Sequence, residues 1–234
     1  MFTKEHINET FIKQFTELGI TNKEEITTII NGFNQIAEIG YKWYINNQLK
    51  KYGGDLAIGA YGIINSIAFT FVMIILGLTQ GMQPIIGYNY GAKLQHRVLS
   101  TLKKGMIAGF VITTIGFLVA ELCPRLIASA FTNDEEMINL SITGFRLFML
   151  AFPIVGMQIV ASNFFQAIGK AKIAIFLSLT RQLLFLIPAL YLIPLILELN
   201  GVWLSTAVAD FLSAFVSLWV LVVAIKKMKK EISL

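Results

Sequence analysis

Four ionisable side chains lie within segments that could cross a membrane, and they are the residues of this sequence best placed to do chemistry. They are Glu38, Arg146, Arg181 and Asp210. A charge at such depth is costly unless it faces protein or water, so each one marks a candidate functional site. Burial disfavours the charged form of a carboxylate, which allows it to take up a proton or Na⁺. We therefore take Glu38 and Asp210 as candidate sites for these ions.

Each of these residues also has a purely structural interpretation. Glu38 could pair with Lys42, four residues later, on a helix that lies at the membrane interface. Arg181 and Asp210 fall in consecutive segments that should form antiparallel helices, so an ion pair between them is feasible and could serve the fold alone. Arg146 lies near enough to a segment end for its long side chain to reach the headgroups.

The composition indicates the kind of fold that carries these charges. Hydrophobic residues make up 56% of the chain and charged residues 14%, against a soluble average of about 25% charged. Five mostly apolar blocks approach or exceed the roughly 20 residues that cross a bilayer. They cover residues 58–80, 105–123, 137–162, 172–197 and 200–225. The sequence predicts an all-α, polytopic membrane helix bundle in contact with the lipid bilayer.

The segment before these blocks is more polar. We predict a polar amphipathic amino-terminal segment over residues 1–27, a polar helix over 28–50, and a membrane lobe over 51–234. The 28–50 helix carries many amide and charged side chains, which make it a poor span on insertion scales. It is either a span that lines a polar cavity or a helix at the interface.

The last block has two distinct faces. Small and polar residues share one side at helical spacing, whereas bulky apolar residues dominate the other side. We expect the small-polar side to pack against neighbouring helices and the bulky side to face lipid. The small-polar side comprises Trp203, Thr206, Ala207, Asp210, Ser213, Ala214 and Ser217, and the bulky side comprises Val208, Phe211, Leu212, Phe215 and Trp219.

The basic residues between the blocks are distributed unevenly. Placing residues 88–104, 166–172 and the tail from Lys226 on one side gives that side ten basic residues, against three on the other. Such a bias is typical of the cytoplasmic side of a membrane protein. We expect a multi-pass protein of the plasma membrane with a cytoplasmic carboxyl terminus. The net charge of +5 is then a topology signal, and we expect no nucleic-acid partner.

A motif at the end of the first apolar block combines glycines, amides and a proline. We expect Pro84 to break the helix and the chain to open into a basic loop, with the amide side chains satisfying the freed backbone groups. The motif would act as a hinge or gate, or alternatively as a rigid turn. Its residues are Gln80, Gln83, Pro84, Gly87, Asn89 and Gly91.

Five pieces of the chain, taken in order, resemble the carboxyl-terminal half of a transporter of the multidrug and toxic compound extrusion (MATE) family. They are Lys51–Gly62, Gln80–Ala92 with Arg97, Phe165–Lys170, Arg181–Pro188 and Gly201–Asp210. The resemblance covers residues 46–225. It implies one six-helix lobe, with five clear transmembrane helices and the 28–50 helix as the sixth.

Members of that family are twelve-helix antiporters that exchange H⁺ or Na⁺ for amphipathic, often cationic drugs in a cavity between two lobes. The resemblance therefore implies a multidrug efflux antiporter that needs a complementary six-helix half or a second copy. Glu38 and Asp210 would bind the coupling ion, and no other cofactor or metal is expected. The candidates to line the cavity are Tyr61, Asn65, Phe69, Gln158, Asn163 and Arg181.

Two other functions remain open. The chain could be a non-transporting or defective membrane subunit, or a lipid-linked sugar flippase of the same superfamily. A soluble enzyme is disfavoured because no nucleophile–base pair, phosphate loop or metal cluster appears outside the apolar segments.

Overall fold

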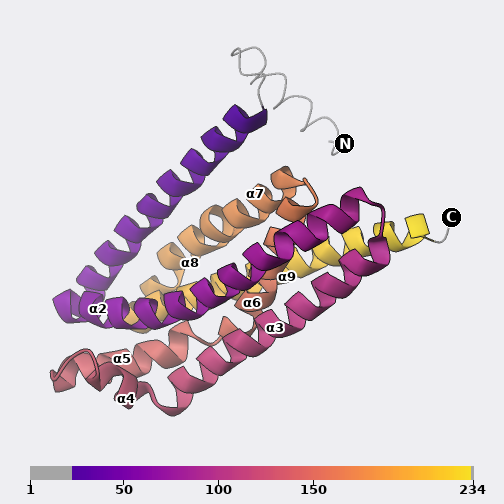
Figure 1. Ribbon diagram of the computed structural model, residues 1–234. Coiled ribbons are helices and arrows are strands. Elements are labelled where there is room, and N and C mark those ends of the chain that lie inside the picture. Colours follow the sequence, from indigo (N-terminus) through magenta and orange to yellow (C-terminus); the bar gives the residue numbers. More distant parts are fainter. Residues whose placement is uncertain (1–22, 233–234) are drawn as a thin grey trace, which may run out of the picture. The chain divides into compact units, whose positions relative to one another are not determined.

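The computed structural model describes the backbone of residues 23–232, and the side chains from Ile39 to Met228 except that of Ala171. The chain divides into two compact units, Met1–Ile39 and Gly40–Leu234, and the packing described below belongs to the second. Most of the predicted 1–27 segment lies outside the described residues. Within residues 23–232 the regular elements are all helices, which confirms the predicted all-α fold (Figure 1). They are α2 (Lys23–Gly91), α3 (Gln95–Leu122), α4 (Pro124–Ser129), α5 (Glu135–Phe148), α6 (Phe152–Ala167), α7 (Ala171–Leu179), the π-helical turn η1 (Thr180–Leu186), α8 (Ile187–Leu192) and α9 (Pro194–Ile232).

Helix α2 is two helices joined at a glycine. Gly54 has a φ of 66° and a ψ of −162°, a conformation that residues with a Cβ rarely adopt. The two helices are separated by a kink at this residue. The helix predicted over residues 28–50 therefore exists as a separate helix before Gly54. That it crosses the membrane stays a prediction.

Four of the five predicted spans fall on stretches of membrane length, and the fifth falls on a pair of shorter helices. In the described part of the chain, four stretches are long and apolar enough to cross a bilayer: Ile39–Gly91, Gln95–Leu122, Lys172–Leu192 and Pro194–Met228. The fifth span is a bent pair, α5 and α6, whose axes differ by 55°. Pro153 lies in the first turn of α6, where its missing N–H costs no hydrogen bond.

The predicted helix break at Pro84 is wrong. Helix α2 continues through Pro84 to Gly91, and α3 begins at Gln95, so the expected basic loop over 88–104 shrinks to a three-residue turn. Lys93 in this turn has a φ of 59°. Proline inside a membrane helix is tolerated when neighbouring groups satisfy the freed backbone. The carbonyl that Pro84 leaves without its helical N–H donor is that of Gln80, four residues earlier, whereas the Asn89 side-chain amide donates to the Ile85 carbonyl at 2.8 Å.

Two apolar clusters form the interior of the lobe. The first gathers residues around Phe145, Phe152 and Trp203, and the second gathers residues around Phe164, Leu177 and Leu221. Helix α6 contributes to both clusters and packs against α3 and α9. The two faces predicted for the last helix are confirmed. Its small-polar side is buried, and Phe211, Leu212, Phe215 and Trp219 are exposed.

Helices α3 and α6 cross through a glycine contact. A Cβ added to Gly109 would lie 2.9 Å from the Gly156 carbonyl oxygen, and a Cβ added to Gly156 would collide with the Gly109 carbonyl. The two backbones touch directly, which is how small residues hold membrane helices together. Thr113, one turn beyond Gly109, donates its hydroxyl to the Pro153 carbonyl across the same contact at 2.9 Å.

We expect Gly156→Ala to destabilise the lobe by about 1–3 kcal/mol, because the added methyl group overpacks the α3–α6 crossing. The matched control is Gly77→Ala, since nothing lies within 4 Å of the Cβ that it would add. The control should be neutral or slightly stabilising through its better helix propensity. Thermal unfolding of both variants in detergent checks this, and equal melting temperatures would contradict the crossing.

Candidate functional site

The candidate site is built around an ion pair inside the bundle. Arg181 Nε donates to Asp210 Oδ1, which confirms that the two residues pair. The Asp210 side chain is only 7% exposed, whereas that of Arg181 is 32% exposed. Asp210 is therefore the more deeply buried partner of the pair. Burial of both charges is tolerable because each neutralises the other.

The ion pair belongs to a polar layer between the two apolar clusters. On α9, Asp210 follows Ala209 of the first cluster and precedes Leu221 of the second. On α6, Gln158 lies between Val155 of the first cluster and Val160 of the second. Both polar residues are buried. The layer therefore crosses the lobe near the middle of its helices.

Arg181 reaches this layer from a π-helical turn. In η1 the Ile187 N–H bonds the Gln182 carbonyl, five residues earlier. Pro188 follows at once, and its ring would clash with the carbonyl four residues before it in a regular helix. We attribute the widened turn to relief of that clash. Such turns are frequent at functional sites, and sequence periodicity had not revealed this one.

Aromatic side chains flank the ion pair. Tyr61 of α2 stacks on Trp203 of α9 with ring centres 6.2 Å apart, and meets the edge of Phe148 of α5 at 6.1 Å. The Tyr61 phenol is close enough to Arg181 and Asp210 to interact electrostatically with both. Tyr41, from the first helix of α2, is similarly close to Arg181. The ion pair thus lies between helices that come from both parts of α2 and from η1 and α9.

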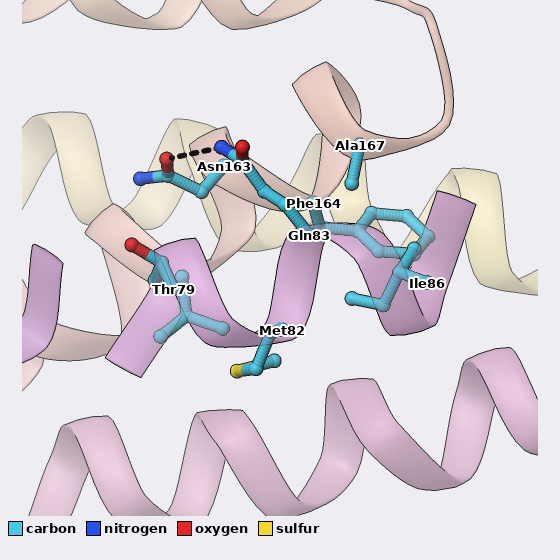
Figure 2. Close-up of a pocket in the computed structure, with 8 residues that line it drawn as sticks. Thr79, Met82, Gln83, Ile86, Asn163, Phe164 and Ala167 are labelled. Carbon is cyan, nitrogen blue, oxygen red and sulfur yellow. Dashed lines mark hydrogen bonds between the residues drawn. The ribbon is translucent and has the colours of Figure 1, made fainter. Parts of the chain in front are cut away.

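The motif around Pro84 forms a second polar contact. Gln83 Nε2 donates to Asn163 Oδ1 of α6 at 3.3 Å (Figure 2), and Asn163 Nδ2 donates to the Ile159 carbonyl at 2.9 Å. Gly87 passes near α6 as well, since an added Cβ would lie 3.3 Å from the Ala167 carbonyl oxygen. Gln83 therefore links α2 to α6. The expected hydrogen bond between its side-chain amide and the backbone of its own helix is not formed.

A shallow depression adjoins this amide pair. It is lined by Thr79, Met82, Gln83, Ile86, Val160, Asn163, Phe164 and Ala167 (Figure 2). Its empty space is about 160 Å³, including space open to the outside, whereas drug-sized ligands occupy sites of about 300–1,000 Å³. The depression is smaller than such sites, and the observed role of Gln83 in this motif is its contact with Asn163 of α6.

The remaining candidate residues are spread over different surroundings. Asn65 and Phe69 are exposed on α2, Gln80, Pro84 and Gly91 are exposed near its end, and Gln158 is buried. The side chain of Glu38 lies outside the described residues. Among the residues that are described, no group of three or more His, Cys, Asp or Glu side chains could hold a metal ion.

Thr113 was not among the residues predicted from the sequence. The single hydrogen of this fully buried hydroxyl is within reach of two acceptors, the Gly109 carbonyl of its own helix and the Pro153 carbonyl of α6. The signal was the run of small residues on one face of α3, Gly105, Gly109, Thr113 and Gly116, which marks a helix contact in membranes.

Comparison with known proteins gives consistent matches over most of the chain. The family MatE matches residues 31–192. The multidrug export protein MepA of Staphylococcus haemolyticus is 24% identical over 191 residues, which are 82% of this chain and 42% of the relative. The present chain thus spans less than half of the length of this relative.

Solved structures show the same relationship. The crystal structure of a MATE protein in complex with MaL6 matches with a TM-score of 0.79 at 19% identity, over 86% of this chain and 46% of the other. A MOP superfamily transporter from Pyrococcus furiosus matches equally well, with a TM-score of 0.79, 19% identity and the same two coverages. These likenesses establish the fold of the lobe.

We expect Asp210→Ala to destabilise the lobe by about 3–5 kcal/mol, because it leaves the Arg181 charge unpaired inside the bundle. The double variant Arg181→Met with Asp210→Leu should recover most of that loss, since neither charge remains buried. The free energies of unfolding of both single variants and of the double variant, measured by chemical unfolding in detergent, give a double-mutant cycle. Additive losses would show that the two residues do not act as a pair.

Proposed function

Because this chain belongs to the MatE family, we propose that it forms one lobe of a multidrug efflux antiporter. The antiporter would expel amphipathic organic cations in exchange for H⁺ or Na⁺. The observation that carries the proposal is the family match over residues 31–192, which includes both the ion pair residue Arg181 and the amide contact between α2 and α6. The protein is then a multi-pass membrane protein, as its family is.

The exposed face of α2 supports a second lobe. Asn65, Ser66, Thr70 and Gln80 are all exposed on this helix. The amides of Asn65 and Gln80 have no hydrogen-bond partner among the described residues, and a polar group left facing lipid is costly. A Cβ added to Gly77 or Gly81 would meet nothing within 4 Å. We propose that this face, with Tyr61 and Phe69, borders the substrate cavity opposite a complementary six-helix half or a second copy of the chain.

The coupling ion would bind at an acidic side chain. Asp210 is the candidate within the described side chains, because it is buried at mid-helix and its arginine partner is partly exposed. Glu38 is the second candidate. Uptake of a positive charge at Asp210 would weaken its attraction for Arg181, and so change how η1 packs on α9.

The proposed orientation places the basic ends of the helices in the cytoplasm and the carboxyl terminus with them. The turn Ala92–Leu94, the start of α7 and the end of α9 would lie inside, and α4 with Cys123 would lie outside. The excess of basic residues on one side supports this arrangement.

We expect that this chain, expressed alone in cells that lack their own drug pumps, does not lower ethidium accumulation. Co-expression with the amino-terminal six-helix half of a related MATE protein should restore efflux, and Asp210→Asn in the same pair should abolish it. Efflux by the 234-residue chain alone would refute the need for a second lobe. No efflux with either partner half or with a fused second copy would favour a non-transporting subunit.

We also expect Cys123 to react with a membrane-impermeant maleimide in intact cells, since this free cysteine is exposed and predicted to face outward. Cys123→Ser should abolish the labelling. In that background Ala92→Cys places an exposed cysteine in the inner turn and should label only after permeabilisation. The opposite pattern would invert the proposed topology.

A further inference from the structure

Two helices of the lobe each carry a pair of exposed lysines beside their apolar stretch. Lys103 and Lys104 of α3 come directly before the apolar block 105–123, and Lys226 and Lys227 of α9 come directly after the block 200–225. Helix α3 has 28 residues and is therefore about 42 Å long, against about 30 Å for the hydrocarbon core. Its first turns thus extend beyond the core, and both lysine pairs fall at the level of the headgroups.

The two lysine pairs lie at the same end of the lobe. The start of α3 and the end of α9 meet there (Figure 1). Val98 and Leu102 of α3 are buried in the same apolar cluster as Leu221 and Met228 of α9. Each lysine pair directly adjoins one of these buried residues in the sequence, Leu102 on α3 and Met228 on α9. The four charges therefore flank one contact between two helices.

On each helix the lysines continue into a stripe of exposed apolar side chains. The stripe residues lie three to eight positions from the lysines, towards the middle of the helix and on the same side of it. A positive end with an apolar stem matches a phospholipid, whose phosphate and acyl chains have the same order. The stripe comprises Ile107, Phe110 and Val111 on α3, and Trp219, Val222 and Val223 on α9.

The protein does not neutralise these four charges. None of the four lysines takes part in an ion pair among the described residues. The sequence has no Asp or Glu over residues 88–120 or 211–228. A lysine pair at the opposite end of the second helix of α2 differs, because Lys50 pairs with Asp55 and Lys51 lies over the Tyr52 ring.

We propose that the exposed sides of α3 and α9 at this end form a binding site for an anionic phospholipid. The lysine pairs bind its phosphate group, and its acyl chains lie along the two apolar stripes. A zwitterionic phospholipid fits less well, because its own ammonium group already compensates its phosphate. A headgroup of net negative charge neutralises the lysines instead. In the proposed orientation this lipid belongs to the cytoplasmic leaflet, and its binding requires neither a drug nor a coupling ion.

Trp219 provides a fluorescence signal for this site. It is exposed on the α9 stripe, seven residues or about 11 Å before Lys226. The full chain would carry Trp43→Phe, because Trp43 is also exposed, whereas Trp203 is buried. In bilayers of phosphatidylcholine, a fraction of the lipid is replaced by phosphatidylglycerol or phosphatidylcholine brominated midway along the acyl chains. The quenching of Trp219 by each brominated lipid gives the ratio of the two binding constants.

We expect phosphatidylglycerol to bind at least about five times more tightly than phosphatidylcholine, since each lysine near the headgroups contributes a factor of about five. High salt should reduce this preference. Equal affinities of the two lipids at low salt would overturn the proposal.

Neutralising each lysine pair tests whether the two helices share the site. Lys103→Gln with Lys104→Gln, and separately Lys226→Gln with Lys227→Gln, should each lower the preference at least threefold. Lys226→Arg with Lys227→Arg should retain it, because the charge remains. The matched control is Lys50→Gln with Lys51→Gln, which should leave it unchanged.

A preference that survives both neutralised pairs, in protein whose melting temperature is unchanged, would refute the site. A loss confined to the α9 pair would refute the contribution of α3. These measurements do not involve transport, so their outcome is independent of efflux.

Discussion

The ion pair between Arg181 and Asp210 is the constraint on which the packing of this lobe depends. A lone charge inside a helix bundle is prohibitively costly, so Asp210 must face its partner. That requirement fixes the rotation of α9 about its axis. The small-polar side of α9 then turns inward to η1 and α6, and its bulky side, with Phe211 and Phe215, turns outward.

The same rule governs the other polar groups of the bundle. The Thr113 hydroxyl bridges α3 and α6 at the glycine crossing, and the Gln83–Asn163 amide pair ties α2 to α6. Both contacts fall where helices approach closely, because small side chains bring backbone carbonyls within reach of polar neighbours. Helix α6, which takes part in both contacts and in both apolar clusters, is accordingly the centre of the lobe.

The proposed second lobe is supported by the polar groups that this lobe leaves exposed. The exposed polar face of α2 and the one-third-exposed Arg181 are unsuitable neighbours for lipid, yet they suit an aqueous cavity or an opposing lobe.

The sequence by itself determined the helical bundle, its apolar segments of membrane length and the two faces of α9, because few structures satisfy the backbone of such segments in a bilayer. It made an ion pair between Arg181 and Asp210 feasible, and the tertiary structure decided that the pair forms. The sequence also placed the Pro84 motif at the end of a helix but predicted a break there. Only the tertiary structure decided that α2 continues to Gly91, that η1 widens before Pro188, and that Gln83 reaches Asn163. These features depend on which neighbouring group bonds each backbone carbonyl or side-chain amide. The periodicity of one helix does not specify its neighbours.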